Sequence, residues 1–164
     1  MCAPSTVAEF SAVGYFFARN LHQTLGVPIG ILHSSWGGTP VEAWMSAATL
    51  ASDPAFKVVD ERWQQALQEY PGKKEVYDKQ LAEWLQAKDL AGRAGASTQA
   101  DFLSVNRPPS LPNGPGLPYQ PSCLYNGMIA PLVPYGIKGA LWYQGEANGP
   151  MWLQYRRLLP TLIA

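Results

Sequence analysis

The chain has 164 residues, of which 47% are hydrophobic and 15% are charged, whereas the typical charged share is about 25%. This length fits one domain, and the apolar content argues against a disordered chain. Twelve Lys and Arg residues balance twelve Asp and Glu residues, which predicts no general attraction to nucleic acid or to an anionic membrane. No apolar run approaches the roughly 18 residues of a membrane span, so we expect no membrane insertion. The residues after Met1 lack the pattern of a signal peptide.

Cysteine and histidine are both scarce in this sequence. Cys2 and Cys123 allow one disulfide or two free thiols, and they are too few for a disulfide framework. His22 and His33 are the only histidines, and neither a CxxC nor an HExxH motif occurs. A zinc site is therefore not expected.

The chain opens with a pattern typical of an amphipathic helix. Ser5 or Thr6 is predicted to cap it, with Glu9 as the partner in a capping box, and Gly26 is predicted to end it. Apolar residues recur at helical spacing and predict its buried face. These residues are Phe10, Val13, Phe17, Leu21 and Leu25.

Two short apolar runs predict buried β-strands, and each leads into a polar loop that contains glycine. Residues 27–33 lead into the loop 34–40, and residues 138–143 lead into the loop 144–148. A helix from about Pro150 to Leu159 follows. We expect the two runs to be parallel strands of one sheet in a layered α/β structure. Ligands bind outside the carboxyl ends of such strands, so the two loops are the place to look for chemistry.

The middle of the chain is rich in charge. Residues 56–90 show helical spacing on both sides of Pro71-Gly72, which predicts two antiparallel helices that project from the sheet. This hairpin is either a lid or partner-binding arm, or a surface insertion with a thin core. Residues 92–121 lack periodicity and contain many prolines, which predicts an extended connector on the surface.

The two polar loops contain residues suited to stabilising an oxyanion. Gly37-Gly38 lets the backbone approach a ligand, and a glycine N–H at a strand end can donate to a developing negative charge. Gln144, Glu146 and Asn148 alternate with small residues, and polar side chains there need partners. A tight turn and a helix N-cap network are the structural alternatives for these two loops.

A nucleophile and base are harder to find. There is no GxSxG motif, and His33 and Ser35 are two residues apart. On a strand their side chains would be about 7 Å apart, which is too far for a direct hydrogen bond. We expect His22, near the polar edge of the first helix, to be solvated.

Three segments resemble blocks of a known family. They read Gly-Val-Pro-Ile-Gly-Ile-Leu-His-Ser-Ser-Trp-Gly-Gly-Thr-Pro-Val-Glu-Ala-Trp over residues 26–44, Leu-Tyr-Asn-Gly-Met-Ile-Ala-Pro-Leu over 124–132, and Trp-Tyr-Gln-Gly-Glu-Ala-Asn over 142–148. In this order they resemble the sialate O-acetylesterases, and residues 2–17 match the segment that leads into them. The resemblance covers the chain apart from roughly residues 50–122.

The resemblance implies a fold and an activity. The fold is the SGNH-hydrolase type, a flavodoxin-like three-layer α/β/α sandwich around a parallel sheet. Residues 1–164 would be a partial, incomplete esterase domain of this type, with residues 50–122 as a helical-hairpin and Pro-rich insertion. The activity is hydrolysis of O-acetyl esters on sialic acid or related glycans through a serine acyl-enzyme, without metal or organic cofactor. A periplasmic or extracellular location is also implied.

The resemblance also implies roles for individual residues. Gly38 would supply a backbone oxyanion donor, Gln144 a side-chain oxyanion donor, and Glu146 would support the site. The residues expected to contact an O-acetylated glycan or small ester are Trp36, Asn126 and Asn148. The Gly-Gln-Ser-Asn block that holds the family's nucleophile does not occur here, nor does the block with its catalytic His and Asp. We therefore interpret the sequence as an internal portion of an esterase domain.

Two alternatives remain open. The chain could be a non-catalytic glycan-binding or interaction domain that lacks the triad. It could also hydrolyse activated esters with its own residues, with Ser35 as nucleophile and His33 or His22 as base. Ser34 and Ser35 belong to the glycine block, and neither is the family's nucleophile. Unpaired strand edges would favour self-association.

Overall fold

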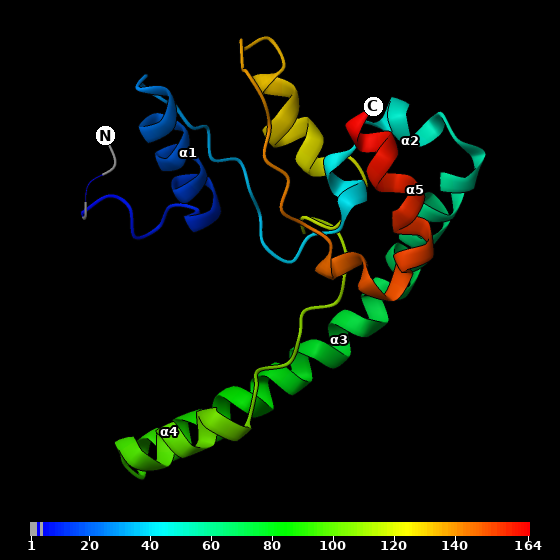
Figure 1. The fold of residues 1–164 in the computed structure, drawn as a ribbon. Coiled ribbons are helices and arrows are strands. Elements are labelled where there is room, and N and C mark those ends of the chain that lie inside the picture. Colours follow the sequence, from blue (N-terminus) through cyan, green and yellow to red (C-terminus); the bar gives the residue numbers. More distant parts are fainter. Residues whose placement is uncertain (1–2, 4) are drawn as a thin grey trace.

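The computed structural model describes residue 3 and residues 5–164, and this part of the chain consists of helices joined by loops (Figure 1). The α-helices are α1 (Ala12–Leu25), α2 (Ala47–Ala51), α3 (Lys57–Arg93), α4 (Ala96–Val105) and α5 (Trp152–Ile163). Shorter 3-10 or π turns are η1 (Val41–Trp44), η2 (Pro54–Phe56), η3 (Tyr125–Ile129), η4 (Ala130–Leu132) and η5 (Glu146–Met151). None of the described helices is both long and apolar enough to cross a membrane.

The predicted parallel sheet is wrong. Residue 3 and residues 5–164 contain no β-strand, so the described chain is not a three-layer α/β/α sandwich. Residues 27–33 and 138–143 run as loops, and within the described residues neither makes a backbone–backbone hydrogen bond. Leu32 stays 53% exposed and Leu141 stays 47% exposed. An apolar run predicts burial, but a strand also needs paired neighbours, and two short strands on their own are marginal in water.

Helix α1 begins later than predicted. The Thr6 hydroxyl turns back to Ala3, accepting from its N–H at 3.0 Å and donating to its carbonyl at 3.3 Å. That hydroxyl is therefore engaged in a local turn, and the predicted capping box is wrong. Ser11 is the N-cap instead, and its Oγ accepts from the N–H of Gly14 at 3.2 Å.

The end of α1 at Gly26 is confirmed. Gly26 adopts a left-handed φ of 67° and its N–H donates to the carbonyl of His22. The helix stands apart from the other helices of the chain (Figure 1). The prediction that its apolar face is buried is therefore wrong. Val13 and Phe17 on that face are 45% and 47% exposed.

The charged stretch forms one helix rather than the predicted pair. Helix α3 runs through 37 residues without a break at Pro71. A proline inside a helix costs about 3 kcal/mol, which the rest of so long a helix can offset. Glu69 and Lys73 form an ion pair at 2.6 Å that spans the proline. The hydrogen bond from Lys73 lowers the pKa of Glu69.

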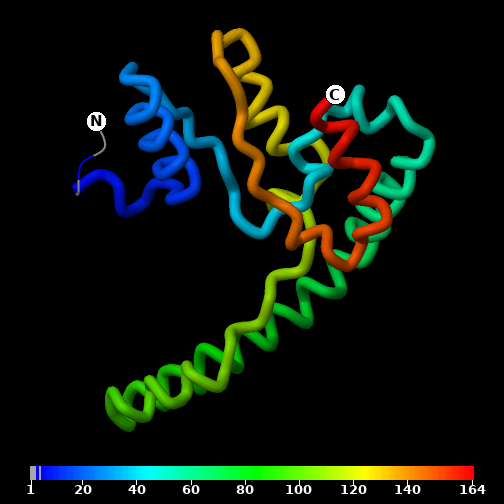
Figure 2. Tube along the Cα trace, viewed as in Figure 1, coloured from blue at the N-terminus to red at the C-terminus, as the bar shows by residue number. Residues whose placement is uncertain are grey.

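Helix α3 has a buried beginning and a solvated remainder. Val59 and Trp63 are buried in its first two turns, at 3% and 9% exposure. No residue of α3 beyond Trp63 is buried. The first turns therefore belong to the core, and the rest projects away from it (Figure 2).

The hairpin in this region lies at Gly95, where α4 turns back onto the end of α3. Gly95 has a φ of 126°, which favours glycine. Residues 96–105 were predicted as connector, but they form α4, and Phe102 packs on Trp84 with ring centroids 6.1 Å apart. This aromatic contact supplies the tertiary packing that a ten-residue helix needs.

The Pro-rich segment after α4 runs back toward the core alongside α3 (Figures 1 and 2). Gly114 lies against the ring of Tyr70 on α3, and a Cβ at this position would overlap the ring. The close approach therefore requires glycine, and it attaches the segment to the helix.

The predicted C-terminal helix is confirmed as α5, although its bounds differ. It begins at Trp152, after the turn η5, and continues past Pro160 to Ile163. Leu158 is its one buried residue and is fully inaccessible.

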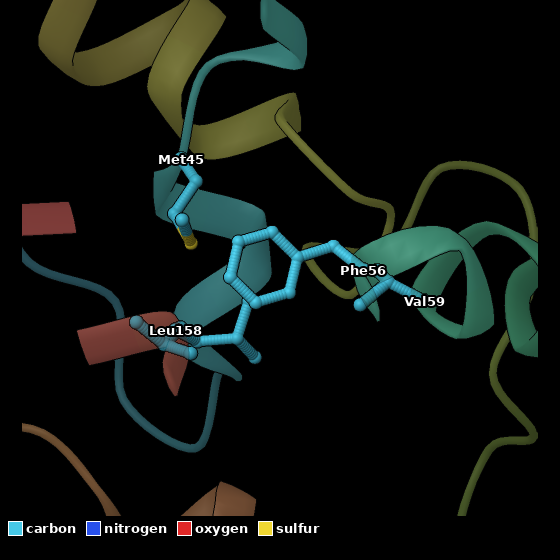
Figure 3. Packing of buried hydrophobic residues seen from close by; sticks show 5 residues of the cluster. Met45, Phe56, Val59 and Leu158 are labelled. Atoms are coloured by element: carbon cyan, nitrogen blue, oxygen red, sulfur yellow. The ribbon is translucent and has the colours of Figure 1, made fainter. Parts of the chain in front are cut away.

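The core consists of two small clusters that share the turn η1. Figure 3 shows the first, in which side chains from η1, η2, α3 and α5 converge. Its buried members are Val41, Met45, Phe56, Val59 and Leu158. The second cluster joins Ala43 and Trp44 of η1 to Leu124. Because η1 directly follows the glycine loop, the core fixes the position of that loop.

Candidate active site

The loops 34–40 and 144–148 lie against each other, as predicted, although neither follows a strand. Gln144 Nε2 donates to the carbonyl of Thr39 at 3.1 Å. Asn148 Oδ1 accepts from the backbone N–H of Val41 at 2.8 Å. Helix α5 also holds this loop, because the Tyr155 hydroxyl donates to the Gln144 carbonyl at 3.1 Å.

Asn148 is the centre of the contact between the loops. It is only 1% exposed, and its amide oxygen accepts both the Val41 N–H and, at 2.7 Å, a hydrogen of Gln144 Nε2. Its Nδ2 donates to Glu42 Oε2 at 2.8 Å. A buried amide with its acceptor and donor sides both satisfied is rigidly placed.

Glu42 is a member of the site that the sequence reasoning missed. Its carboxylate is 3% exposed, and Arg62 of α3 pairs with it at 2.5 Å. Arg62 also donates through Nη1 to Gln154 Oε1 at 3.1 Å. The available signal was a lone acidic residue among apolar neighbours in Val41-Glu42-Ala43-Trp44, immediately after the glycine loop. A charge in that setting is rare unless it is paired.

The nitrogen of the Gln144 amide forms hydrogen bonds, whereas its oxygen forms none with the described residues. Its Nε2 donates to Thr39 O and to Asn148 Oδ1, so both hydrogens are engaged. Its Oε1 is buried and has no partner among the described residues. Each unpaired buried polar atom is costly, and it marks a place where a ligand's donor would be stabilising.

The glycine loop presents backbone and aromatic groups to solvent. Gly38 has a left-handed φ of 74°, and its N–H donates to no acceptor within residue 3 and residues 5–164. Thr39 anchors the loop, because its hydroxyl donates to the Trp36 carbonyl at 2.7 Å and accepts from Trp44 Nε1 at 2.9 Å. Trp36 itself is 53% exposed.

Two of the predicted site residues lie outside this hydrogen-bonded network. Asn126 in η3 and Glu146 at the start of η5 are exposed. Ser34 links the glycine loop to η3, because its hydroxyl donates to the Met128 carbonyl at 3.3 Å. The structure thus unites Gln144 and Asn148 with the glycine loop and leaves Glu146 at the edge.

Ser35 and His33 are closer than predicted. The distance from Ser35 Oγ to His33 Nε2 is 2.5 Å, which corrects the expectation of about 7 Å. That expectation assumed an extended strand, whereas the segment is a loop. Both side chains are exposed, and the His33 ring packs on Phe10 with centroids 4.9 Å apart. His22 is exposed as predicted, and its Nδ1 lies 2.6 Å from the Val27 carbonyl.

Cys123 is a free thiol beside Trp44 and Leu124, and burial raises its pKa, so it is mostly protonated near neutral pH. Cys2 lies outside the described residues. No group of three His, Cys, Asp or Glu side chains in the described part of the chain could hold a metal ion.

Two surface depressions lie away from the glycine loop. One, of about 340 Å³, is bounded by α3 and the Pro-rich segment, including Val76, Tyr77 and Pro112. The other, of about 300 Å³, lies beside Arg62 and Trp152.

Comparison with known proteins identifies the relatives of this chain. It is 34% identical over 156 residues to the sialate O-acetylesterase of Rattus norvegicus, a match that covers 94% of this chain. The sialate O-acetylesterases of Mus musculus and Homo sapiens are 35% and 31% identical over 138 residues, or 84% of the chain. The chain belongs to the sialate O-acetylesterase family.

The matches span only part of these relatives. The aligned region is 24% of the length of the rat protein, 21% of the mouse protein and 17% of the human protein. No family model matches the chain. No solved structure matches it either.

Proposed function

We propose that this chain acts in the removal of O-acetyl groups from sialic acid or related glycans, as the oxyanion-binding and substrate-positioning part of a carboxylic-ester hydrolase. The relatives named sialate O-acetylesterase support the reaction class. The observation that carries the proposal is the junction of the two loops. There the Gln144 amide donates to the carbonyl of Thr39, the residue after Gly38. Among the described residues the Gly38 N–H donates to no acceptor and the buried Gln144 Oε1 has no partner.

The proposed chemistry is attack of a serine hydroxyl on the acetyl carbonyl, followed by hydrolysis of the acyl-enzyme. Negative charge develops on the carbonyl oxygen, and the Gly38 N–H would donate to it. Gln144 Nε2 would donate as well, by exchanging its longer bond to Thr39 O for the oxyanion while its bond to Asn148 persists. One such donor typically contributes about 3 kcal/mol to transition-state stabilisation.

The remaining roles concern the substrate. Trp36, half exposed beside the glycine loop, would stack on a sugar ring, and Asn126 would line the same side. Glu146 would support the loop from its exposed edge.

Binding to the chain itself tests the proposal. Titration of an O-acetylated sialic acid, followed by saturation-transfer NMR, should show a preference over the de-acetylated sugar. Gln144→Ala should weaken this preference, because the variant lacks the amide. Binding of both sugars without preference would contradict the esterase role and favour the alternative, a non-catalytic glycan-binding domain.

The short Ser35–His33 contact favours a second candidate function. His33 Nε2 could take the proton of Ser35 Oγ as the hydroxyl attacks an activated acetyl ester, and return it to the departing alkoxide. Water would then release acetate from Ser35. The test is mass spectrometry after a fluorophosphonate probe, which would label Ser35 if it is activated. An unlabelled Ser35 would refute this candidate.

A further inference from the structure

We propose that Glu42 is a positioning residue, which sets the orientation of the Gln144 amide through Asn148. The inference rests on the proposed function, because it assigns a support to the residue that would contact the oxyanion. The contacts that carry it form one chain of short hydrogen bonds, from Arg62 on α3 through Glu42 and Asn148 to Gln144. Glu42 touches no substrate in this scheme and acts only through the two amides.

The orientation of the Asn148 amide is decided by its neighbours. The Val41 N–H can only donate, so the atom it contacts at 2.8 Å must be the amide oxygen. The Glu42 carboxylate can only accept when ionised, so the atom 2.8 Å from it must be the amide nitrogen. A flip of Asn148 would break both bonds and bring like groups together. Glu42 thus favours one of the two amide orientations.

The same logic passes from Asn148 to Gln144. The atoms facing this amide are Thr39 O and Asn148 Oδ1, and both are acceptors. The Gln144 nitrogen must therefore face them, and its oxygen must face away. If Asn148 were flipped, its Nδ2 donor would face Gln144. The orientation that points the Gln144 nitrogen toward Asn148 would then no longer be favoured. The donor that the proposed oxyanion role needs consequently depends on the contact of Asn148 with Glu42.

Arg62 pairs with the buried carboxylate of Glu42. An unpaired carboxylate at 3% exposure would be strongly unfavourable, and the guanidinium lies 2.5 Å away. Arg62 is carried by α3, and its side chain is 38% exposed. The first turns of α3 therefore support the site as well as the core, rather than forming a separate arm.

The experiment reads the Gln144 side-chain amide directly. Its ¹H–¹⁵N signals are assigned by their loss in Gln144→Ala, and Glu42→Gln replaces the carboxylate by an amide of the same size. We expect the Gln144 signals to shift and their hydrogen exchange to accelerate about tenfold, the order expected for the loss of one net hydrogen bond. A folded Glu42→Gln variant with unchanged Gln144 signals would overturn the proposal.

Asp53→Asn is the matched control. Asp53 pairs with Arg157 at 2.7 Å and joins η2 to α5, but its carboxylate contacts neither amide. Its loss should lower stability without moving the Gln144 signals. Equal shifts of the Gln144 signals in both variants would show a general loosening of the fold, which would also overturn the proposal.

A pair of Arg62 variants tests the same link if Glu42→Gln does not fold. Arg62→Met removes the donor, whereas Arg62→Lys retains a cationic donor on a long aliphatic stem. We expect accelerated exchange at Gln144 in Arg62→Met and near-normal exchange in Arg62→Lys. Unchanged exchange at Gln144 in both, or the same acceleration in both, would refute the positioning role. These readouts need no substrate, so failure of the esterase proposal would appear separately, as an absent preference for the acetylated sugar.

Discussion

Leu158 should be the most sensitive aliphatic position in α5. It is fully buried between η1, η2 and α3, as one of the five buried residues that form the first core cluster. Leu158→Ala removes three carbon atoms, worth about 0.8 kcal/mol each in transfer free energy, and the cavity left behind adds to that loss. We expect the free energy of unfolding to fall by about 3 kcal/mol, a large fraction of the total for a domain of this size.

Urea denaturation followed by circular dichroism and tryptophan fluorescence measures this change. The matched control is Leu153→Ala on the same helix, where the leucine is 64% exposed and the loss should stay below about 0.5 kcal/mol. Similar losses in both variants would refute the reasoning, because helix propensity rather than burial would then explain them. An unchanged midpoint in Leu158→Ala would show that the cluster in Figure 3 does not support the fold.

Four further predictions concern the site and the long helix. In a complete esterase, Gln144→Ala should lower turnover roughly 10²- to 10³-fold with little change in the unfolding midpoint, as for the loss of one oxyanion donor. Pro71→Ala should raise the free energy of unfolding by roughly 1–3 kcal/mol, because it restores a helical N–H, and an unchanged or lower value would contradict this. Burial raises the pKa of Cys123, so near pH 8 a smaller fraction of this thiol is ionised in the native chain than in the unfolded chain. Alkylation of Cys123, measured by peptide mass spectrometry, should therefore be slower in the native chain than in urea. If the chain acts only as the oxyanion-binding part of the hydrolase, its hydrolysis of p-nitrophenyl acetate should not exceed a surface-histidine background, whereas robust turnover abolished by Ser35→Ala would contradict that expectation and favour the second candidate function.

The sequence allowed the meeting of the two loops to be predicted, but for an incorrect reason. The prediction assumed that residues 27–33 and 138–143 were neighbouring strands whose ends share one edge of a sheet. The loops meet instead because η1 and α5 are buried in one cluster, and because Asn148 caps the Val41 N–H. Apolar composition records which segments favour burial, but not whether a partner strand is present to pair with them.

The same limit applies to the long helix. Pro71-Gly72 is a strong local stop signal, and a reading of neighbouring residues alone places a turn there. The structure continues α3 through the proline, because helical residues on both sides and the Glu69–Lys73 pair outweigh one missing hydrogen bond. Helix α4 was missed for the converse reason, since its support is the contact of Phe102 with Trp84, far away in the sequence. Tertiary packing therefore decided the second case, whereas the first rests on contacts within α3 itself.

Glu42 shows why the position of the site could be predicted from the sequence although its hydrogen-bond network could not. Motif residues identify Gln144 and Asn148, because polar side chains after an apolar run need partners. The partner itself, Glu42, lies 106 positions away from Asn148 along the chain, and its counter-charge comes from Arg62 on a helix that the sequence pattern assigns to a surface insertion. Buried polar groups therefore extend the site beyond its motifs and into the first turns of α3. A truncation that removes Arg62 with the rest of α3 should consequently disturb the Gln144 amide, whereas one confined to the solvated region beyond Trp63 should leave it in place.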